Sequence, residues 1–325
     1  MKEFWRRWGW PLIKLIIACA LIIWLMRQGK LDVALLKQVA SDPLLVVAAL
    51  LLNMALITLA AVRWRLLLSI QDIPLSFSWA HRVTYIGYFF NAFLPSAVGG
   101  DAMRVAYVAR AESQQRVKAV LSVFFDRLLG LYSLCVAGLL VTLSDPAAYL
   151  AIPAIRLLTL AIVGVIIGLP LGLALLYVLS KRSAWIARAL QAEHPNAVQI
   201  LIHRGVDAMR LFRRNPGAVM RALGASILSQ FMGMGAIAWV GVSLQSEPIA
   251  AQHYAFGLPW AWIAGLLPVT PGGLGVGEAA FDHILRWVAG PDVLTAFATI
   301  FLAFRILSML ATAPGLIAYI LYKNR

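Results

Sequence analysis

The sequence predicts an all-α polytopic membrane protein, with six full spans and two re-entrant broken-helix hairpins arranged as an inverted repeat. The first observation behind this prediction is composition, because 62% of the 325 residues are hydrophobic and only 13% are charged. Soluble domains contain roughly 25% charged residues, so this chain is too apolar for a water-soluble fold. The second observation is a string, Leu-Pro-x-x-x-Gly-Gly, which occurs twice, at residues 94–100 and 267–273.

Six apolar stretches are long enough to cross a bilayer, because a spanning helix needs about 20 mostly apolar residues. They are residues 11–26, 43–62, 119–142, 156–179, 217–243 and 293–322. Two further segments, near 83–100 and 254–285, contain the repeated strings and are expected to form the re-entrant hairpins. Proline removes a backbone donor and Gly-Gly admits positive φ, so a helix cannot run straight through either string. Such broken backbone is tolerated at membrane depth only where protein buries it or where it lines a watery cavity.

The expected orientation is multi-pass with both termini in the cytoplasm. With this choice, most of the 28 Lys and Arg residues fall on the cytoplasmic side, as the positive-inside rule requires. Because these residues lie between apolar spans, the net charge of +14 indicates lipid headgroups and not nucleic acid as the partner. The basic connector, residues 181–215, is expected to form amphipathic helices on the cytoplasmic membrane surface.

The single transmembrane domain, residues 1–325, divides into two units, 1–145 and 146–325. Each unit holds two spans, a hairpin and a closing span, and the expected orientation inverts the second unit relative to the first. The closing spans contain similar strings, Phe-Phe-Asp-Arg-Leu-Leu at 124–129 and Leu-Ala-Phe-Arg-Ile-Leu at 302–307. Secondary transporters bind their substrates at the interface of such repeats. The alternative is a chance recurrence in a chain rich in Leu, Pro and Gly.

Charged residues inside spans are costly, so Asp126, Arg127 and Arg305 are candidates for function. Adjacent residues of a helix point about 100° apart, so Asp126 and Arg127 need not pair with each other. Arg305 has no acidic residue in its span and needs a partner from another helix or an anionic ligand. Ion pairs between helices are one alternative, and the examples are Arg305 with Glu278 and Arg127 with Asp101. Binding of a ligand phosphate is the other, and the two are compatible.

The residues around the two breaks are also candidates. Asp101 either caps the helix that follows the first break or faces the cavity, and Arg104 either binds phosphate or marks topology. Asn91 either satisfies freed backbone groups or contacts ligand. Glu278 is expected to cap, to pair or to bind a proton, whereas Asp282 and His283 are expected to be solvated rim residues. The residues expected to shape the broken helices are Pro95, Gly99, Gly100, Pro268, Gly272 and Gly273.

Three strings, in order along the chain, carry a family resemblance. They are Asn-Ala-Phe-Leu-Pro-Ser-Ala-Val-Gly-Gly-Asp-Ala-Met-Arg at 91–104, Asp-Arg-Leu-Leu-Gly-Leu at 126–131 and Pro-Val-Thr-Pro-Gly-Gly-Leu-Gly-Val-Gly-Glu at 268–278. These strings resemble the lysylphosphatidylglycerol synthase transmembrane (flippase-like) family. The resemblance implies lipid translocation, which this membrane part performs in two-domain synthases for an aminoacylated lipid made by a separate cytosolic domain. Because this sequence stops soon after its last expected span, it resembles a stand-alone member without the synthase domain.

The main functional hypothesis is a flippase of a bacterial inner membrane that moves an anionic, phosphate-bearing lipid or lipid-linked precursor through a cavity between the units. The residues expected to bind the headgroup are Arg104, Arg127, Arg305 and Asn91. Those expected to pair with the arginines or to couple transport are Asp101, Asp126 and Glu278. The alternative is a non-catalytic accessory subunit that docks a lipid-modifying enzyme, such as a glycosyltransferase, through the basic connector. Both hypotheses are compatible with a homo-oligomer.

Catalysis finds little support in the sequence motifs, and an enzyme that acts on a lipid phosphate at the arginine cluster is a third, weaker alternative. The sequence contains no nucleophile elbow, no zinc-ligand spacing and no paired-carboxylate motif. We therefore expect a protein that is not an enzyme and that has neither a metal site nor a cofactor.

Overall fold

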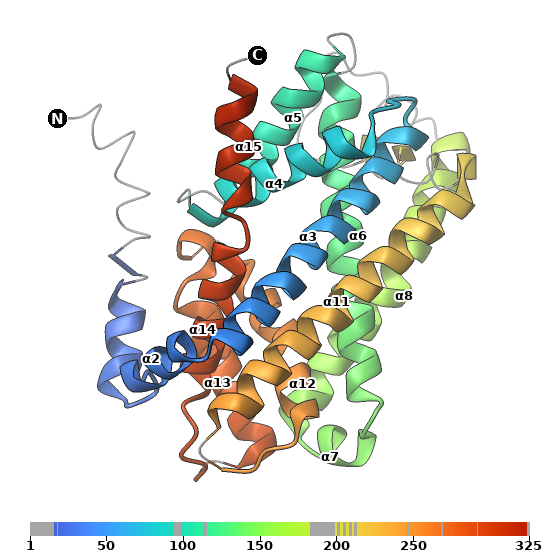
Figure 1. The fold of residues 1–325 in the computed structure, drawn as a ribbon. Coiled ribbons are helices and arrows are strands. Elements are labelled where there is room, and N and C mark those ends of the chain that lie inside the picture. Colours follow the sequence, from blue (N-terminus) through green and yellow to red (C-terminus); the bar gives the residue numbers. More distant parts are fainter. Residues whose placement is uncertain are drawn as a thin grey trace, which may run out of the picture.

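A computed structural model describes most of residues 16–323, and every regular element in that part of the chain is a helix (Figure 1). Outside the described residues lie 1–15, 18, 94–98, 113–115, 183–198, 200–201, 204–205, 208–209, 211–212, 246, 268, 291 and 324–325. The expected first span, 11–26, and the basic connector, 181–215, are therefore described only in part. Pro95 and Pro268, which the sequence places at the breaks, also lie outside the described residues.

Within the described residues, five helical stretches are long and apolar enough to cross a membrane. They are α3 (Pro43–Ile70), α6 (Arg116–Thr142), α8 (Pro153–Arg182), α11 (Pro216–Leu244) and the pair α14 (Phe297–Leu310) and α15 (Pro314–Lys323). The expectation of an all-α polytopic membrane protein is therefore confirmed. Each of the first four extends beyond the stretch expected from the sequence, because a helix does not end where its apolar window ends.

The last expected span, 293–322, is not one continuous helix. A turn at 311–313 separates α14 from α15, which begins at Pro314. Proline cannot donate a backbone hydrogen bond and its ring clashes with the preceding turn, so the helix restarts at this residue. The Thr312 hydroxyl donates to the Met309 carbonyl oxygen and satisfies one of the acceptors freed by the turn.

The first hairpin is formed by α4 (Phe77–Phe93) and α5 (Gly99–Ala111), which pack against each other in the upper part of Figure 1. The two helices approach so closely that a Cβ built on Gly100 would lie 1.8 Å from the carbonyl oxygen of Gly87. Only glycine fits at this crossing. α4 also packs against α3 and α15, so elements from both ends of the chain enclose the hairpin.

Replacing Gly100 by alanine is expected to force α4 and α5 apart. Overpacking of a tightly packed site costs about 1–3 kcal/mol, so the midpoint of thermal unfolding in detergent should fall. The matched control is Gly164→Ala on α8, where an added Cβ has open space around it. An equal unfolding midpoint for both variants would contradict the close crossing.

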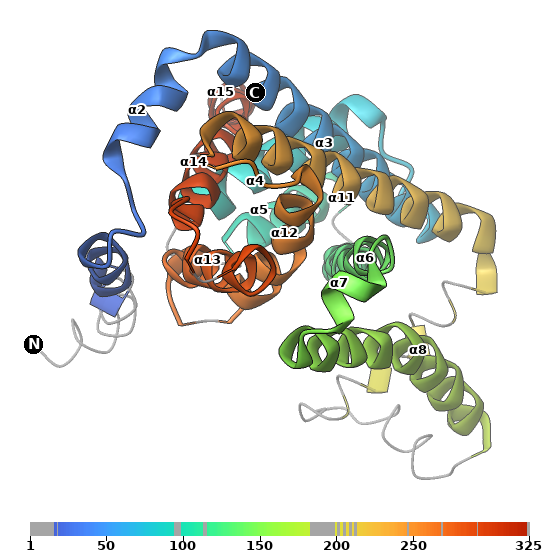
Figure 2. The same cartoon turned by 90° about the horizontal axis from the view of Figure 1, so that it is seen from below.

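The second hairpin is formed by α12 (Ala251–Gly265) and α13 (Val276–Ala289), joined through a short 3₁₀ turn, η1 (Pro271–Gly273). Its helices lie in the lower part of Figure 1 and at the centre of Figure 2, with α8 at the periphery. Gly272 and Gly273 have φ of 58° and 72°, in the left-handed region that favours glycine. In the described part of the turn, this Gly pair adopts a non-helical backbone between α12 and α13.

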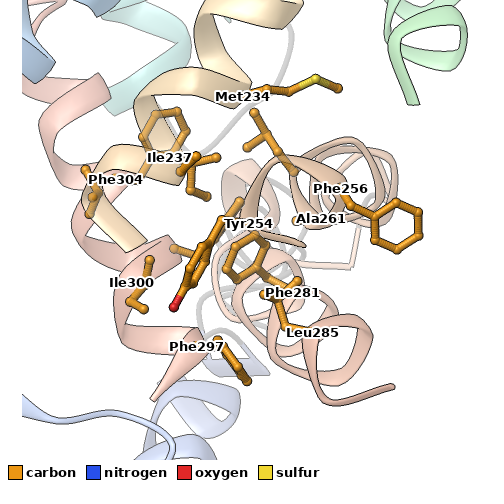
Figure 3. Packing of buried hydrophobic residues seen from close by; sticks show 14 of the residues in the cluster. Met234, Ile237, Tyr254, Phe256, Ala261, Phe281, Leu285, Phe297, Ile300 and Phe304 are labelled. Carbon is orange, nitrogen blue, oxygen red and sulfur yellow. The ribbon is translucent and has the colours of Figure 1, made fainter. Parts of the chain in front are cut away.

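The main apolar core surrounds the second hairpin (Figure 3). Ile237 of α11, Tyr254 of α12, Phe281 of α13 and Phe304 of α14 are all buried in it. In a bilayer, lipid tails are as apolar as these side chains, so close van der Waals packing holds the helices together more than the hydrophobic effect does. The core consequently fixes α12 and α13 relative to α11 and α14.

A buried acid ties the N-terminal part of the chain to the lower end of the bundle. Asp282 of α13 is fully buried and pairs with Lys30 at 2.8 Å and with Arg286 at 3.1 Å. The Asp32 amide, just before α2 (Val33–Ser41), donates to the Thr299 hydroxyl of α14 at 2.8 Å. The expectation of a solvated rim residue is therefore wrong for Asp282, because its ion pairs with two cations compensate for the loss of water around the carboxylate. His283 is exposed, as expected.

Candidate functional site

A buried carboxylate at the centre of α6 joins three helices of the first unit. The Arg63 Nε of α3 donates to Asp126 Oδ1 at 2.7 Å, and the Arg104 Nη1 of α5 donates to Asp126 Oδ2 at 2.8 Å. The three side chains are at most 8% exposed. Two guanidinium groups on one carboxylate leave this triad with an excess positive charge.

The two arginines of the triad differ in how completely their hydrogen bonds are satisfied. Arg63 Nη1 donates to the Ser226 hydroxyl of α11 at 2.7 Å, and this hydroxyl lies 2.8 Å from the Ser133 hydroxyl of α6. Arg104 lies over the Trp64 ring, 4.2 Å from its centroid, but its buried Nε and Nη2 have no hydrogen-bond partner among the described residues. Such unpaired buried donors are costly and are rare in native proteins.

A second, more exposed ion pair lies beside the triad. Arg127 donates from Nε and Nη2 to the two carboxylate oxygens of Asp101, at 2.9 and 3.1 Å. Asp101 occupies the first turn of α5, where the helix dipole stabilises a negative charge. The Arg127 side chain is 52% exposed, although it lies well inside α6. Asp126 and Arg127 therefore point to different neighbours, as their spacing predicts.

The start of α5 uses one polar side chain to satisfy its backbone. The Gly100 amide donates to Asn91 Oδ1 at 2.9 Å, across the break between α4 and α5. The N-terminal amides of a helix have no partner within the helix, and the Asn91 side chain satisfies one of them for α5. This contact fits the backbone-satisfying alternative for Asn91 that the sequence left open.

In the second hairpin, one arginine binds an acid and two backbone carbonyls. Arg305 Nη1 donates to Glu278 Oε1 at 2.8 Å and to the Gly273 carbonyl oxygen at 3.2 Å, and its Nη2 donates to the Gly272 carbonyl oxygen. Glu278 Oε2 accepts from the Gly275 amide at 2.7 Å, at the start of α13. The Arg305 side chain is 8% exposed and that of Glu278 is 1% exposed. Arg305 thus holds the broken backbone together.

The two hairpins repeat one arrangement of charges. In each, an acid in the first turn after the break pairs with an arginine of the following helix, as Asp101 does with Arg127 and Glu278 with Arg305. The partners are 26 residues apart in the first pair and 27 in the second. Both ion pairs that the sequence suggested as alternatives to ligand binding are therefore present.

Sequence reasoning missed Arg63, which binds Asp126 from α3. A span ending at residue 62 places Arg63 in a cytoplasmic loop, but α3 continues to Ile70 and buries this side chain. The sequence signal that this part of α3 is buried is the neighbouring Trp64. Its indole N–H donates to the Ser122 hydroxyl of α6 at 3.2 Å. Arg104, interpreted from the sequence either as a phosphate ligand or as a topology charge, has a side chain that is only 3% exposed and pairs with Asp126.

This chain is similar over most of its length to a known protein family and to a curated protein. Residues 12–315 match the family described as Lysylphosphatidylglycerol synthase TM region. A curated relative, a UPF0104 membrane protein of Methanocaldococcus jannaschii, is 25% identical over 326 residues, which cover 96% of this chain and 95% of the relative. No solved structure matches. Because the family match covers nearly the whole chain, this protein belongs to the lysylphosphatidylglycerol synthase TM region family.

Proposed function

We propose that this protein is a flippase that moves an anionic, phosphate-bearing lipid or lipid-linked precursor across the inner membrane of a bacterium. The observation that carries the proposal is the unbalanced charge around the first hairpin. Three guanidinium groups, those of Arg63, Arg104 and Arg127, face two carboxylates, those of Asp101 and Asp126. This leaves one excess positive charge within the described residues, at membrane depth, where an uncompensated charge is costly.

An anionic headgroup would supply the negative charge and the hydrogen-bond acceptors that this cluster of arginines needs. A phosphate offers several strong acceptors for guanidinium N–H groups, and the buried Nε and Nη2 of Arg104 have no acceptor among the described residues. The N-terminus of α5 adds the positive end of a helix dipole on the same side of the cluster. Arg127, half-exposed within a span, would face hydrocarbon at high cost unless a polar ligand reached it.

The proposal includes six spans and an inverted repeat, with both termini in the cytoplasm. It is supported by the similar ion pairs, with partners 26 and 27 residues apart, in hairpins at opposite ends of the bundle. In the described conformation the arginine of the first pair, Arg127, is half-exposed, whereas both members of the second pair are buried. We propose that transport exchanges these two states, so that a headgroup reaches Arg127 from one side and Arg305 from the other.

The family name supports lipid as the substrate, since it refers to the synthase of an aminoacylated lipid. The charge pattern adds a phosphate group to that class without naming the rest of the molecule. Between transport events Asp101 and Glu278 would pair with Arg127 and Arg305, and these pairs would break when the headgroup binds.

The experiment is an assay of lipid flipping in proteoliposomes. Fluorescent phosphatidylglycerol, which is anionic, and fluorescent phosphatidylcholine, which is zwitterionic, are each incorporated in both leaflets, and dithionite bleaches the outer leaflet. The proposal predicts that wild-type protein exposes phosphatidylglycerol to bleaching faster than empty liposomes do, and faster than it exposes phosphatidylcholine. Equal rates with and without protein for the anionic lipid would contradict it.

A further inference from the structure

A second group of cations lies outside the hairpin cluster, at the end of the bundle where α3 finishes and α6 begins. These elements and the described residues Asp207, Arg210 and Arg214 form a recess of about 180 Å³. Lys118 of α6 also lines the recess. The ion pairs around Asp126 involve neither this lysine nor the two arginines.

The walls of this recess carry more positive than negative charge. Arg210 pairs with Asp207 at 3.2 Å, and Arg214 pairs with Asp72 at 2.7 Å. Lys118 is half-buried and makes no ion pair with a described residue. Three cations and two carboxylates leave one positive charge without a partner in this part of the structure. An anion is therefore the ligand that the recess favours.

The floor of the recess is apolar. Ile70 and Phe125 are each 4% exposed, and Leu121 lies between Lys118 and Phe125 on α6. Lys118 and Phe125 are seven residues apart, which corresponds to about 10 Å along the helix. The recess thus extends from the charged end of α6 toward the apolar middle of this helix.

We propose that this recess binds the phosphate of an anionic phospholipid from the adjacent leaflet, separately from the transport site. Basic pockets between transmembrane helices are a recognised kind of site for anionic headgroups, and Lys and Arg can extend from apolar surface to reach a phosphate. The apolar floor favours a lipid over free phosphate, because inorganic phosphate gains nothing from Leu121 and Phe125. The proposal does not depend on lipid flipping by the protein.

The bound lipid would fasten the described end of the basic connector to the bundle. The connector already touches α8, where Arg213 donates to the Tyr177 hydroxyl at 2.8 Å and Val206 packs with Tyr177 in one apolar cluster. A phosphate among Lys118, Arg210 and Arg214 would add a link from the connector to α6. The expected consequence is that removing the lipid loosens this attachment and leaves the helices of the bundle in place.

The test is native mass spectrometry of protein taken from nanodiscs that contain phosphatidylglycerol. The recess variant is Lys118→Gln/Arg210→Gln/Arg214→Gln. The control removes the same charge from exposed arginines outside the recess, as Arg65→Gln/Arg82→Gln/Arg221→Gln. The proposal predicts that the recess variant retains at least about fivefold less of one phosphatidylglycerol, since several charge-assisted hydrogen bonds are lost, while the control retains as much as wild type.

Three further measurements keep the outcome decisive. Arg127→Ala should keep the recess lipid, so its loss together with the transport lipid would overturn the claim of a separate site. Inorganic phosphate at millimolar concentration should not displace the lipid, and displacement would overturn the lipid assignment in favour of a soluble phosphate ligand. If the triple variant does not elute as a single species, Arg210→Gln alone is measured, and equal retention by this variant and wild type would overturn the proposal.

Discussion

Replacing Asp126 by asparagine is expected to destabilise the protein more than any other single conservative change near the first hairpin. The variant would leave Arg63 and Arg104 buried without their shared carboxylate, and the Asn amide N–H₂ would face guanidinium donors. Removing one partner of a buried ion pair costs about 3–5 kcal/mol. We expect a lower midpoint of thermal unfolding in detergent and a smaller monodisperse fraction on size-exclusion chromatography.

The matched control is Asp145→Asn. Asp145 caps α7 (Pro146–Leu150) by accepting from the Ala148 amide at 3.1 Å, and asparagine caps a helix as well as aspartate does. This variant should therefore unfold like wild type. An Asp126→Asn protein as stable as the control would show that the carboxylate is not the shared partner of two buried arginines.

Replacing Arg127 by alanine is expected to have the largest effect on transport with the smallest effect on folding. Its side chain is half-exposed and, among the described residues, donates hydrogen bonds to Asp101, so its loss leaves the buried triad intact. A hydrogen bond to a charged group contributes about 1.5–3 kcal/mol, which corresponds to roughly a 10- to 100-fold decrease in rate. The measurement is dithionite bleaching of fluorescent phosphatidylglycerol in proteoliposomes.

Two comparisons separate headgroup binding from folding. Arg156→Ala removes an exposed arginine at the start of α8 and should leave the flipping rate unchanged. Arg305→Ala should lower both the rate and the unfolding midpoint, because Arg305 also holds Glu278 and the backbone of the break. If Arg127→Ala flips phosphatidylglycerol at the wild-type rate, the assignment of Arg127 to the headgroup is wrong.

The positions of the breaks could be predicted from the sequence because they depend on local backbone chemistry. Glycine is needed at Gly272 and Gly273, where φ is positive, and at Gly100, where two helices cross. The pairs of Arg127 and Arg305 could be proposed as alternatives, since a charge within an apolar span needs a partner and each hairpin offers an acid just after its break. The sequence did not decide between ion pairing and ligand binding, because both satisfy the same donors.

Features that depend on tertiary packing could not be predicted. Arg63 follows an apolar stretch and resembles a charge at the membrane interface, but α3 continues and buries it against Asp126. Asp282 resembles a rim residue until Lys30, far away in the chain, approaches it. The break before Pro314 was not expected either, since proline is tolerated inside transmembrane helices when neighbours satisfy the freed backbone groups.

The most direct test of the central claim is native mass spectrometry of the gently purified protein, with its lipids identified after release. Wild type is compared with Arg127→Ala/Arg305→Ala. The account predicts that wild type retains a specific anionic lipid at the hairpins and that the double variant loses it while keeping other bound lipids. Equal retention of the same lipids by two well-folded proteins would contradict the account, because the arginines would then not bind the headgroup.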